Sequence, residues 1–175
     1  MDKNLKIIDD LLSYQDWNNL KTILSGHAFD WYFSDVIYDY ELGSSDDDLD
    51  NWQFCHCLYK DHFAQSTRYD LLTPFLNNDK IIINSLVKAK INNQPRRQSI
   101  IKQGFHVDVD FKCTTGIYYV NSNNGYTEFE DGTKVESKSN RFVTFNSDIR
   151  HTGTTCTDKK QRLVININYF NGNED

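Results

Sequence analysis

Three side chains in this sequence have the types and spacing of a metal centre. His106 and Asp108 stand two residues apart in the segment GFHVDVD, and His151 follows much later, after the apolar run FVTF. Alternate side chains of an extended strand share a face, so His106 and Asp108 would point the same way. Two imidazole nitrogens and one carboxylate oxygen fill half of an octahedral coordination sphere, which suits non-haem Fe(II) and its oxygen chemistry. A His-x-Asp pair also arises by chance, and by itself it favours ordinary surface or core histidines.

The carboxyl-terminal half supplies the elements that would position these residues. Short β-rich runs alternate with polar turns such as NNG at 123–125 and DG at 131–132. The sequence predicts strands over 82–91, 105–111, 115–121, 128–129, 134–135, 142–145 and 162–170. Regularly spaced short strands of this kind are typical of an all-β sandwich or jelly roll.

The amino-terminal half predicts helices that pack outside this core. Residues 5–12 fit either a strand or a helical turn. Ser13 followed by Asp16 resembles a capping box, and Gly26 stands where a left-handed cap belongs, which predicts a helix over 14–24. We further expect a strand or two in 29–40, a solvated loop over 41–51, a strand over 52–59 and a short helix over 69–76 with Pro74 within or near its end.

Length and charge limit the kind of protein. The 175 residues correspond to one domain, 1–175, in which 1–81 would support a core over 82–170. The net charge of -6 argues against a general nucleic-acid binder, because phosphate neutralisation needs a basic surface. No apolar run approaches the length of a bilayer span and the amino terminus does not resemble a leader, so the expected location is the cytoplasm.

The four cysteines, Cys55, Cys57, Cys113 and Cys156, are too sparse and irregular for a disulfide framework. Cys55-His56-Cys57 superficially resembles a metal site. Strand alternation would send His56 to the face opposite the two cysteines, and no second cysteine pair follows. Packing of two small side chains on one strand face is therefore the favoured interpretation.

Several blocks of the second half, taken together, resemble a known family. In order they are GFHVDVD, TGIYYVN, NGYTEFEDG, NRFVTFNSDIRHTG and RLVININYF. They are similar to the double-stranded β-helix core of the Fe(II)- and 2-oxoglutarate-dependent oxygenases, and within that superfamily to the prolyl-4-hydroxylase-like branch, especially its compact members in bacteria and marine bacteriophages. The resemblance covers about residues 82–170. It implies a mainly β (α+β) fold, a jelly roll with N-terminal helices packed on one sheet.

The resemblance also implies roles for individual residues. It makes His106, Asp108 and His151 the iron ligands. It places Arg162 where the family has a basic residue that pairs with the distal carboxylate of 2-oxoglutarate, a task that suits a planar, bidentate guanidinium. A surface salt bridge is the alternative for Arg162. Tyr119, in IYYVN, matches a family tyrosine whose hydroxyl contacts the cosubstrate carboxylate.

Strand alternation adds a third residue to this expected anion site. Arg162, Asn166 and Asn168 share one face of the predicted strand 162–170, and so polar a face is not ordinary core. If that face looks into the barrel, Asn166 could hydrogen-bond the same carboxylate as Arg162. The same alternation favours Tyr119 over Tyr118, although a slip of one residue would reverse the choice.

By resemblance, the expected activity is hydroxylation of a protein side chain, prolyl included, or of a small molecule. Fe(II), O2 and 2-oxoglutarate would take part, with ascorbate as reductant, and the cosubstrate would be decarboxylated oxidatively to succinate and CO2. If the protein is viral, its place is the host cytoplasm. Two alternatives stay open: a non-catalytic jelly-roll metal-binding module, and a cupin-like metalloenzyme without cosubstrate. Asp108 stands where cupins more often use histidine, and this residue and Arg162 both count against a cupin-like enzyme. Substrate determinants are expected in 92–103 and 41–51.

Overall fold

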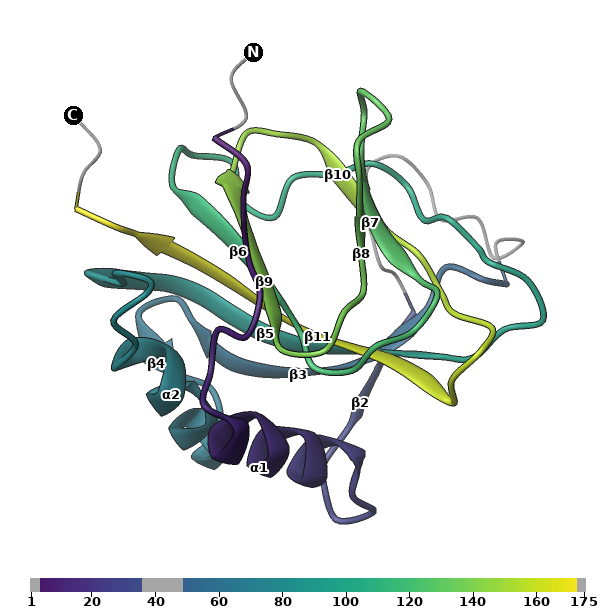
Figure 1. Cartoon of the computed structure of the whole chain (residues 1–175), viewed down its shortest axis with the longest axis horizontal. Coiled ribbons are helices and arrows are strands. Elements are labelled where there is room, and N and C mark those ends of the chain that lie inside the picture. Colours follow the sequence, from purple (N-terminus) through teal and green to yellow (C-terminus); the bar gives the residue numbers. More distant parts are fainter. Residues whose placement is uncertain (1–3, 36–48, 173–175) are drawn as a thin grey trace.

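The computed structural model describes residues 4–35 and 49–172 (Figure 1). The strands are β1 (Lys6–Ile8), β2 (Tyr32–Ser34), β3 (Gln53–Lys60), β4 (Phe63–Ala64), β5 (Ser85–Pro95), β6 (Thr114–Tyr119), β7 (Tyr126–Phe129), β8 (Lys134–Glu136), β9 (Arg141–Asn146), β10 (His151–Gly153) and β11 (Gln161–Phe170). The helices are α1 (Tyr14–Ser25), the 3-10 helix η2 (Thr67–Leu72) and α2 (Thr73–Leu76). None of the helices in the described ranges is long and apolar enough to cross a membrane.

The strands form two antiparallel sheets. The large sheet has the order β1-β9-β6-β11-β5-β3-β2, with β4 paired to β3, and the small sheet has the order β10-β7-β8. In Figure 1 the helices α1 and α2 lie below the large sheet and the small sheet lies above it. The predicted mainly β jelly roll with N-terminal helices on one sheet is confirmed. Strands β1, β2 and β3 from the first half of the chain belong to the same sheet as the strands of the second half.

Both faces of the large sheet are buried, and strand alternation assigns side chains to each. Tyr118, Leu163 and Ile165 belong to the apolar cluster shared with the helices. Tyr119 and Val164 belong to a second cluster, shared with side chains of the small sheet. The two adjacent tyrosines therefore lie on opposite sides of β6, as the alternation predicts.

Helix α1 confirms the predicted helix 14–24 to within a residue. The Ser13 hydroxyl accepts a hydrogen bond from the Asp16 backbone N–H at 3.1 Å, which is the expected cap. The Trp17 indole Nε1 donates to the Val120 carbonyl at 2.9 Å and ties the helix to the sheet. The side chains that the helix buries completely are Leu20 and Leu24.

Two helix-end predictions are corrected. Gly26 is not left-handed: its φ is -74° and ψ is 158°, because its N–H closes a tight last turn on the Ile23 carbonyl and the chain then leaves extended. The helix predicted over 69–76 begins earlier, as a 3-10 helix at Thr67, and becomes α-helical only from Thr73. Pro74 lies in the first turn of α2, where its missing N–H has no partner to lose.

Among the remaining strand predictions, one alternative is settled, one prediction is wrong and one falls partly outside the described residues. Of the residues 5–12, three form β1, which settles the strand-or-helix alternative in favour of a strand. The predicted strand 105–111 is wrong: its only pairing is an isolated bridge between His106 and His151. The partner strand β10 has only three residues, so a longer ladder has nothing to pair with. Residues 36–48 lie outside the described ranges, and they include part of the predicted strands in 29–40 and most of the predicted loop over 41–51.

Candidate metal centre

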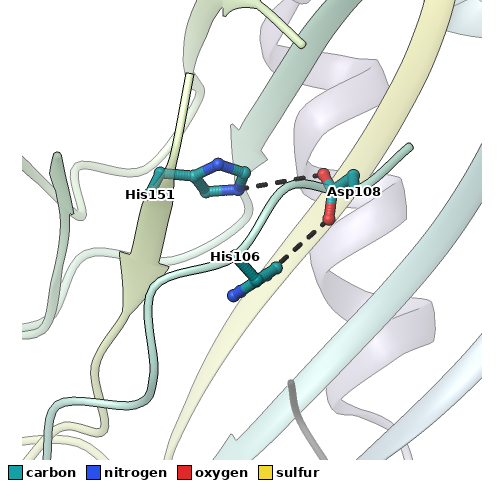
Figure 2. Close-up of side chains that lie close together, drawn as sticks. All are labelled: His106, Asp108 and His151. Atoms are coloured by element: carbon teal, nitrogen blue, oxygen red, sulfur yellow. Dashed lines mark ion pairs between the residues drawn. The ribbon is translucent and has the colours of Figure 1, made fainter. Parts of the chain in front are cut away.

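The structure brings His106, Asp108 and His151 together. One ligand atom from each residue lies within 4.8 Å of the others, a group that could hold a metal ion. His106 Nε2 is 3.8 Å from Asp108 Oδ1, and His151 Nε2 is 3.8 Å from Asp108 Oδ2. Figure 2 shows the two imidazoles directed at the two oxygens of one carboxylate. The three donors thus converge from a loop and from the start of β10.

Backbone hydrogen bonds decide which ring nitrogen of each histidine is available. His106 Nδ1 lies 3.0 Å from the Gly104 carbonyl oxygen, and His151 Nδ1 lies 3.2 Å from the Ile149 carbonyl oxygen. A carbonyl oxygen only accepts, so in each neutral imidazole Nδ1 carries the proton and donates it. The lone pair then stays on Nε2, the atom that faces Asp108, and both rings are held in the tautomer that ligates a metal through Nε2.

The electrostatics of the group favour the protonation states of a metal site. Burial lowers the pKa of His151, although Asp108 partly opposes the shift, so the ring is neutral near pH 7. Burial alone would raise the pKa of Asp108, but in the acid range where a carboxyl group titrates, attraction to the nearby His151, His106, Lys88 and Lys90 outweighs burial and lowers that pKa. A neutral imidazole and an ionised carboxylate are the forms that bind a metal.

The loop that carries Asp108 is anchored to the large sheet. His106 and His151 exchange two backbone hydrogen bonds of 3.0 Å, which fixes the loop beside β10. The Lys88 ammonium on β5 donates to the Asp108 carbonyl oxygen at 3.3 Å, and Asn166 Nδ2 on β11 donates to Asp108 Oδ2 at 3.5 Å. These contacts, and not strand alternation, turn Asp108 toward the histidines.

A cavity of about 750 Å³ opens over this group. It is lined by five of the six predicted site residues, His106, Asp108, His151, Arg162 and Asn166. Tyr119 does not line it. The Tyr119 hydroxyl donates to Thr127 Oγ1 at 2.8 Å, and Thr127 is the residue that faces the cavity.

Arg162 is a buried cation with only neutral hydrogen-bond partners. Its Nε donates to Ser137 Oγ at 3.0 Å, its Nη1 to Gln94 Oε1 at 3.4 Å and its Nη2 to Thr127 Oγ1 at 3.3 Å. The side chain is 3% exposed, and burial lowers its pKa. Among residues 4–35 and 49–172, none of the ion pairs includes Arg162. A Cβ on Gly125 would meet Arg162 Cδ at 2.8 Å, so a glycine leaves room for the stem.

Sequence analysis missed the partners of Arg162. Thr127 and Ser137 lie on separate segments, and nothing in their local sequence distinguishes them from other small polar residues. Gln94 did carry a signal, because KAKINNQ alternates polar side chains with Ala89 and Ile91. That alternation places Gln94 on the cavity face of β5, directly across from Arg162 on β11.

Comparison with known proteins identifies the fold. No protein-family model matches the chain, and no curated protein sequence matches it. An oxidoreductase of the 2OG-Fe(II) oxygenase family from Burkholderia pseudomallei has a TM-score of 0.65 at 8% identity, over 97% of this chain and 86% of that one. A prolyl-4-hydroxylase from Pseudomonas putida has a TM-score of 0.58 at 11% identity, over 97% and 94%. The viral collagen prolyl hydroxylase from Paramecium Bursaria Chlorella virus-1 has a TM-score of 0.55 at 13% identity, over 95% of each chain.

These likenesses confirm the resemblance inferred from the sequence, at the level of the fold. The chain has the jelly-roll fold of the 2OG-Fe(II) oxygenases, a class that includes viral and bacterial prolyl hydroxylases. The identities are too low to carry a substrate from one protein to another. The expected use of ascorbate and the similarity to bacteriophage members stay predictions.

Proposed function

We propose that this chain is an Fe(II)- and 2-oxoglutarate-dependent dioxygenase that hydroxylates a protein side chain or a small molecule. The observation that carries the proposal is the buried, acid-free Arg162 in the same cavity as the histidine and aspartate donors. A desolvated guanidinium is costly unless an anion pairs with it. The distal carboxylate of 2-oxoglutarate would supply that anion.

The donor set fits the implied metal. His106 and His151 would bind it through Nε2 and Asp108 through a carboxylate oxygen, the combination that leaves open positions on non-haem Fe(II). Bound Fe(II) would supply the activation of O2, with 2-oxoglutarate decarboxylated to succinate and CO2. The protein's own residues would position the cosubstrate. Phe145, whose ring centroid lies 4.8 Å from that of His151, would shield this imidazole from water.

Tyr119 and Asn166 would have different tasks. Tyr119 would act through Thr127, whose hydroxyl it holds next to the Arg162 guanidinium. Asn166 would orient Asp108, because its amide donor is directed to that carboxylate. The predicted contact of Asn166 with the cosubstrate carboxylate stays a prediction.

The two alternative functions leave Arg162 without a role. A metal-binding module or a cupin-like enzyme needs the three donors, but neither requires a buried cation with no acidic partner. The dioxygenase proposal accounts for both features of the cavity.

The proposal is tested by metal-dependent cosubstrate binding. We expect calorimetric titration to show 2-oxoglutarate binding to the protein with Mn(II) present and not with a chelator present. His106→Ala should abolish this binding and also succinate formation with Fe(II) and air. His27→Ala, which changes an exposed histidine outside the cavity, is the matched control and should behave as the unmodified protein. Mn(II) binding without any 2-oxoglutarate binding would refute the proposal.

A further inference from the structure

Two lysines of β5 face the cavity. In the segment KAK, Ala89 is fully buried on the helix side of the sheet, while Lys88 and Lys90 point to the other side and line the cavity. We call Lys88 and Lys90 the lysine pair. Both side chains are half-buried, although lysines on a sheet usually extend into solvent.

Neither lysine of the pair lies within ion-pair distance of an acidic side chain in the described part of the chain. No ion pair within residues 4–35 and 49–172 includes Lys88 or Lys90. Lys88 makes a hydrogen bond to the backbone carbonyl of Asp108 at 3.3 Å. The single negative charge of Asp108 attracts both lysines but forms an ion pair with neither, and a bound metal would share that charge. Two ammonium groups on one strand face repel each other unless an anion lies between them.

Other basic residues along the cavity do have acidic partners. The Lys60 ammonium is 3.7 Å from Asp61, and Arg150 Nε is 2.7 Å from Glu130. Within the described ranges, the lysine and arginine side chains of the cavity that form no ion pair are therefore Arg162 at one end and the lysine pair at the other.

The register between β5 and β11 separates these two cationic sites. Lys90 pairs with Asn166 and Lys88 pairs with Asn168, whereas Arg162 lies on β11 four residues before Asn166. Four residues of strand span about 13 Å. Asn166 contacts Asp108, and Lys88 donates to the Asp108 carbonyl oxygen, so the metal donors lie beside the lysine pair. One small dicarboxylate bound at Arg162 leaves the lysine pair free.

Apolar side chains complete the lysine end of the cavity. Val107 and Phe111 line it, and both are partly exposed. Phe111 stacks on Phe170 with ring centroids 6.1 Å apart. A cavity of about 750 Å³ has room for a second molecule beside a five-carbon cosubstrate.

We propose that the primary substrate carries a carboxylate or phosphate group that pairs with Lys88 and Lys90. This inference rests on the proposed function, since it assigns the lysine end of the cavity to the substrate and the Arg162 end to 2-oxoglutarate. The anion would fix the substrate beside the metal donors, with its uncharged part against Val107 and Phe111. An acidic peptide and a small anionic molecule share this chemistry.

Fluorescence polarisation tests the peptide source. The probes are two rhodamine-labelled pools of random decapeptides, one rich in Asp and Glu and one with Asn and Gln in their place. The protein carries Mn(II) and saturating 2-oxoglutarate, so that Arg162 is occupied. We expect the acidic pool to bind at least about tenfold more tightly than the amide pool, the gain of one charge-assisted contact.

Substitutions assign that preference to the lysine pair. Lys90→Gln should reduce it to about twofold, and Lys90→Glu should transfer it to a pool rich in Lys and Arg, which a merely structural role would not do. Lys159→Gln removes the same charge from an exposed position outside the cavity and should change nothing.

Inorganic phosphate tests the small-molecule source. If only small anions enter the cavity, phosphate should raise the melting temperature of the unmodified protein above its value in chloride at equal ionic strength. The increase should be smaller in the double variant K88Q/K90Q. The inference is overturned if neither the acidic pool nor phosphate distinguishes the unmodified protein from K88Q/K90Q. Failure of 2-oxoglutarate to bind to the unmodified, Mn(II)-loaded protein would instead overturn the dioxygenase proposal. The double variant does not decide that point, because Lys88 also anchors the Asp108 loop.

Discussion

Replacement of Arg162 by methionine separates a cosubstrate anchor from a structural residue. In the free protein the guanidinium donates three hydrogen bonds, two of them at 3.3 and 3.4 Å. At such lengths the three together contribute about 3 kcal/mol. Desolvation of the buried cation costs several kcal/mol and offsets that gain. Arg162→Met should therefore change the free energy of unfolding by less than about 2 kcal/mol, or about 4–8 °C in melting temperature for a chain of this size.

The effect on 2-oxoglutarate binding should be much larger. Loss of one partner of a buried ion pair costs about 3–5 kcal/mol, which corresponds to about a 10²- to 10⁴-fold weaker Kd. At 100 times the Kd, 2-oxoglutarate stabilises the Mn(II)-loaded protein by about 2.7 kcal/mol, or about 5–11 °C. At the same concentration the variant should gain less than about 0.5 kcal/mol. Differential scanning calorimetry with and without 2-oxoglutarate measures both quantities.

Arg141→Met is the matched control. Arg141 lies on β9, and its guanidinium is bound to Asp9 by hydrogen bonds of 2.6 and 3.1 Å on the outside of the protein. Its loss should cost about 1 kcal/mol and leave the 2-oxoglutarate stabilisation unchanged. A stabilisation by 2-oxoglutarate that persists in Arg162→Met, or a loss of more than about 4 kcal/mol in the free variant, would contradict the assignment of Arg162 as the anion partner.

Four further outcomes follow from contacts of the site and of the core. Asn166→Ala removes the donor that orients Asp108 and should weaken Mn(II) binding about 10- to 100-fold in a calorimetric titration. Metal affinity should fall as the pH is lowered, because protons compete with the metal for the imidazoles. Burial lowers the pKa of His151, so this ligand is lost only below the ordinary histidine pKa of about 6.5. Because that pKa is lower in the folded than in the unfolded protein, the metal-free protein should also lose stability in denaturant titrations as the pH falls below about 6.5. Gly116→Ala places a methyl group against the ring of Phe142 and should destabilise the protein by about 1–3 kcal/mol in urea unfolding.

Two of these outcomes have a specific contradiction. Asn168→Ala is the control for Asn166→Ala, since Asn168 lies on the same face of β11 but donates to Thr115. An equal loss of Mn(II) affinity in both variants would argue against orientation of Asp108 by Asn166. A metal affinity that stays constant down to the pH at which the metal-free protein unfolds would argue against ligation by the imidazoles. Gly132→Ala is not a matched control for Gly116, because Gly132 has a φ of 85° and would be strained for a different reason.

Arguments from strand alternation succeeded where a strand formed. The opposite placement of Tyr118 and Tyr119 and the cavity-facing position of Arg162 follow from a side-chain period of two, which is a local property of the backbone. The same argument failed over 105–111, where the alternation of His106, Val107 and Asp108 is present but no strand forms. Alternation predicts which side chains would share a face, but a strand also requires a neighbouring strand with which its backbone can pair.

By itself, the sequence determined the mainly β fold, the cap and length of α1, and the three residues that now lie together as a candidate metal centre. Only the tertiary structure showed that Tyr119 stands behind Thr127, that Asn166 contacts Asp108, and that the lysine pair lies at the end of the cavity opposite Arg162. The physical reason is that propensity, capping and alternation act between neighbours in the chain. The register of β5 against β11 and the anchoring of the Asp108 loop depend on contacts between segments that are distant in sequence, and these contacts decide what each polar side chain can reach.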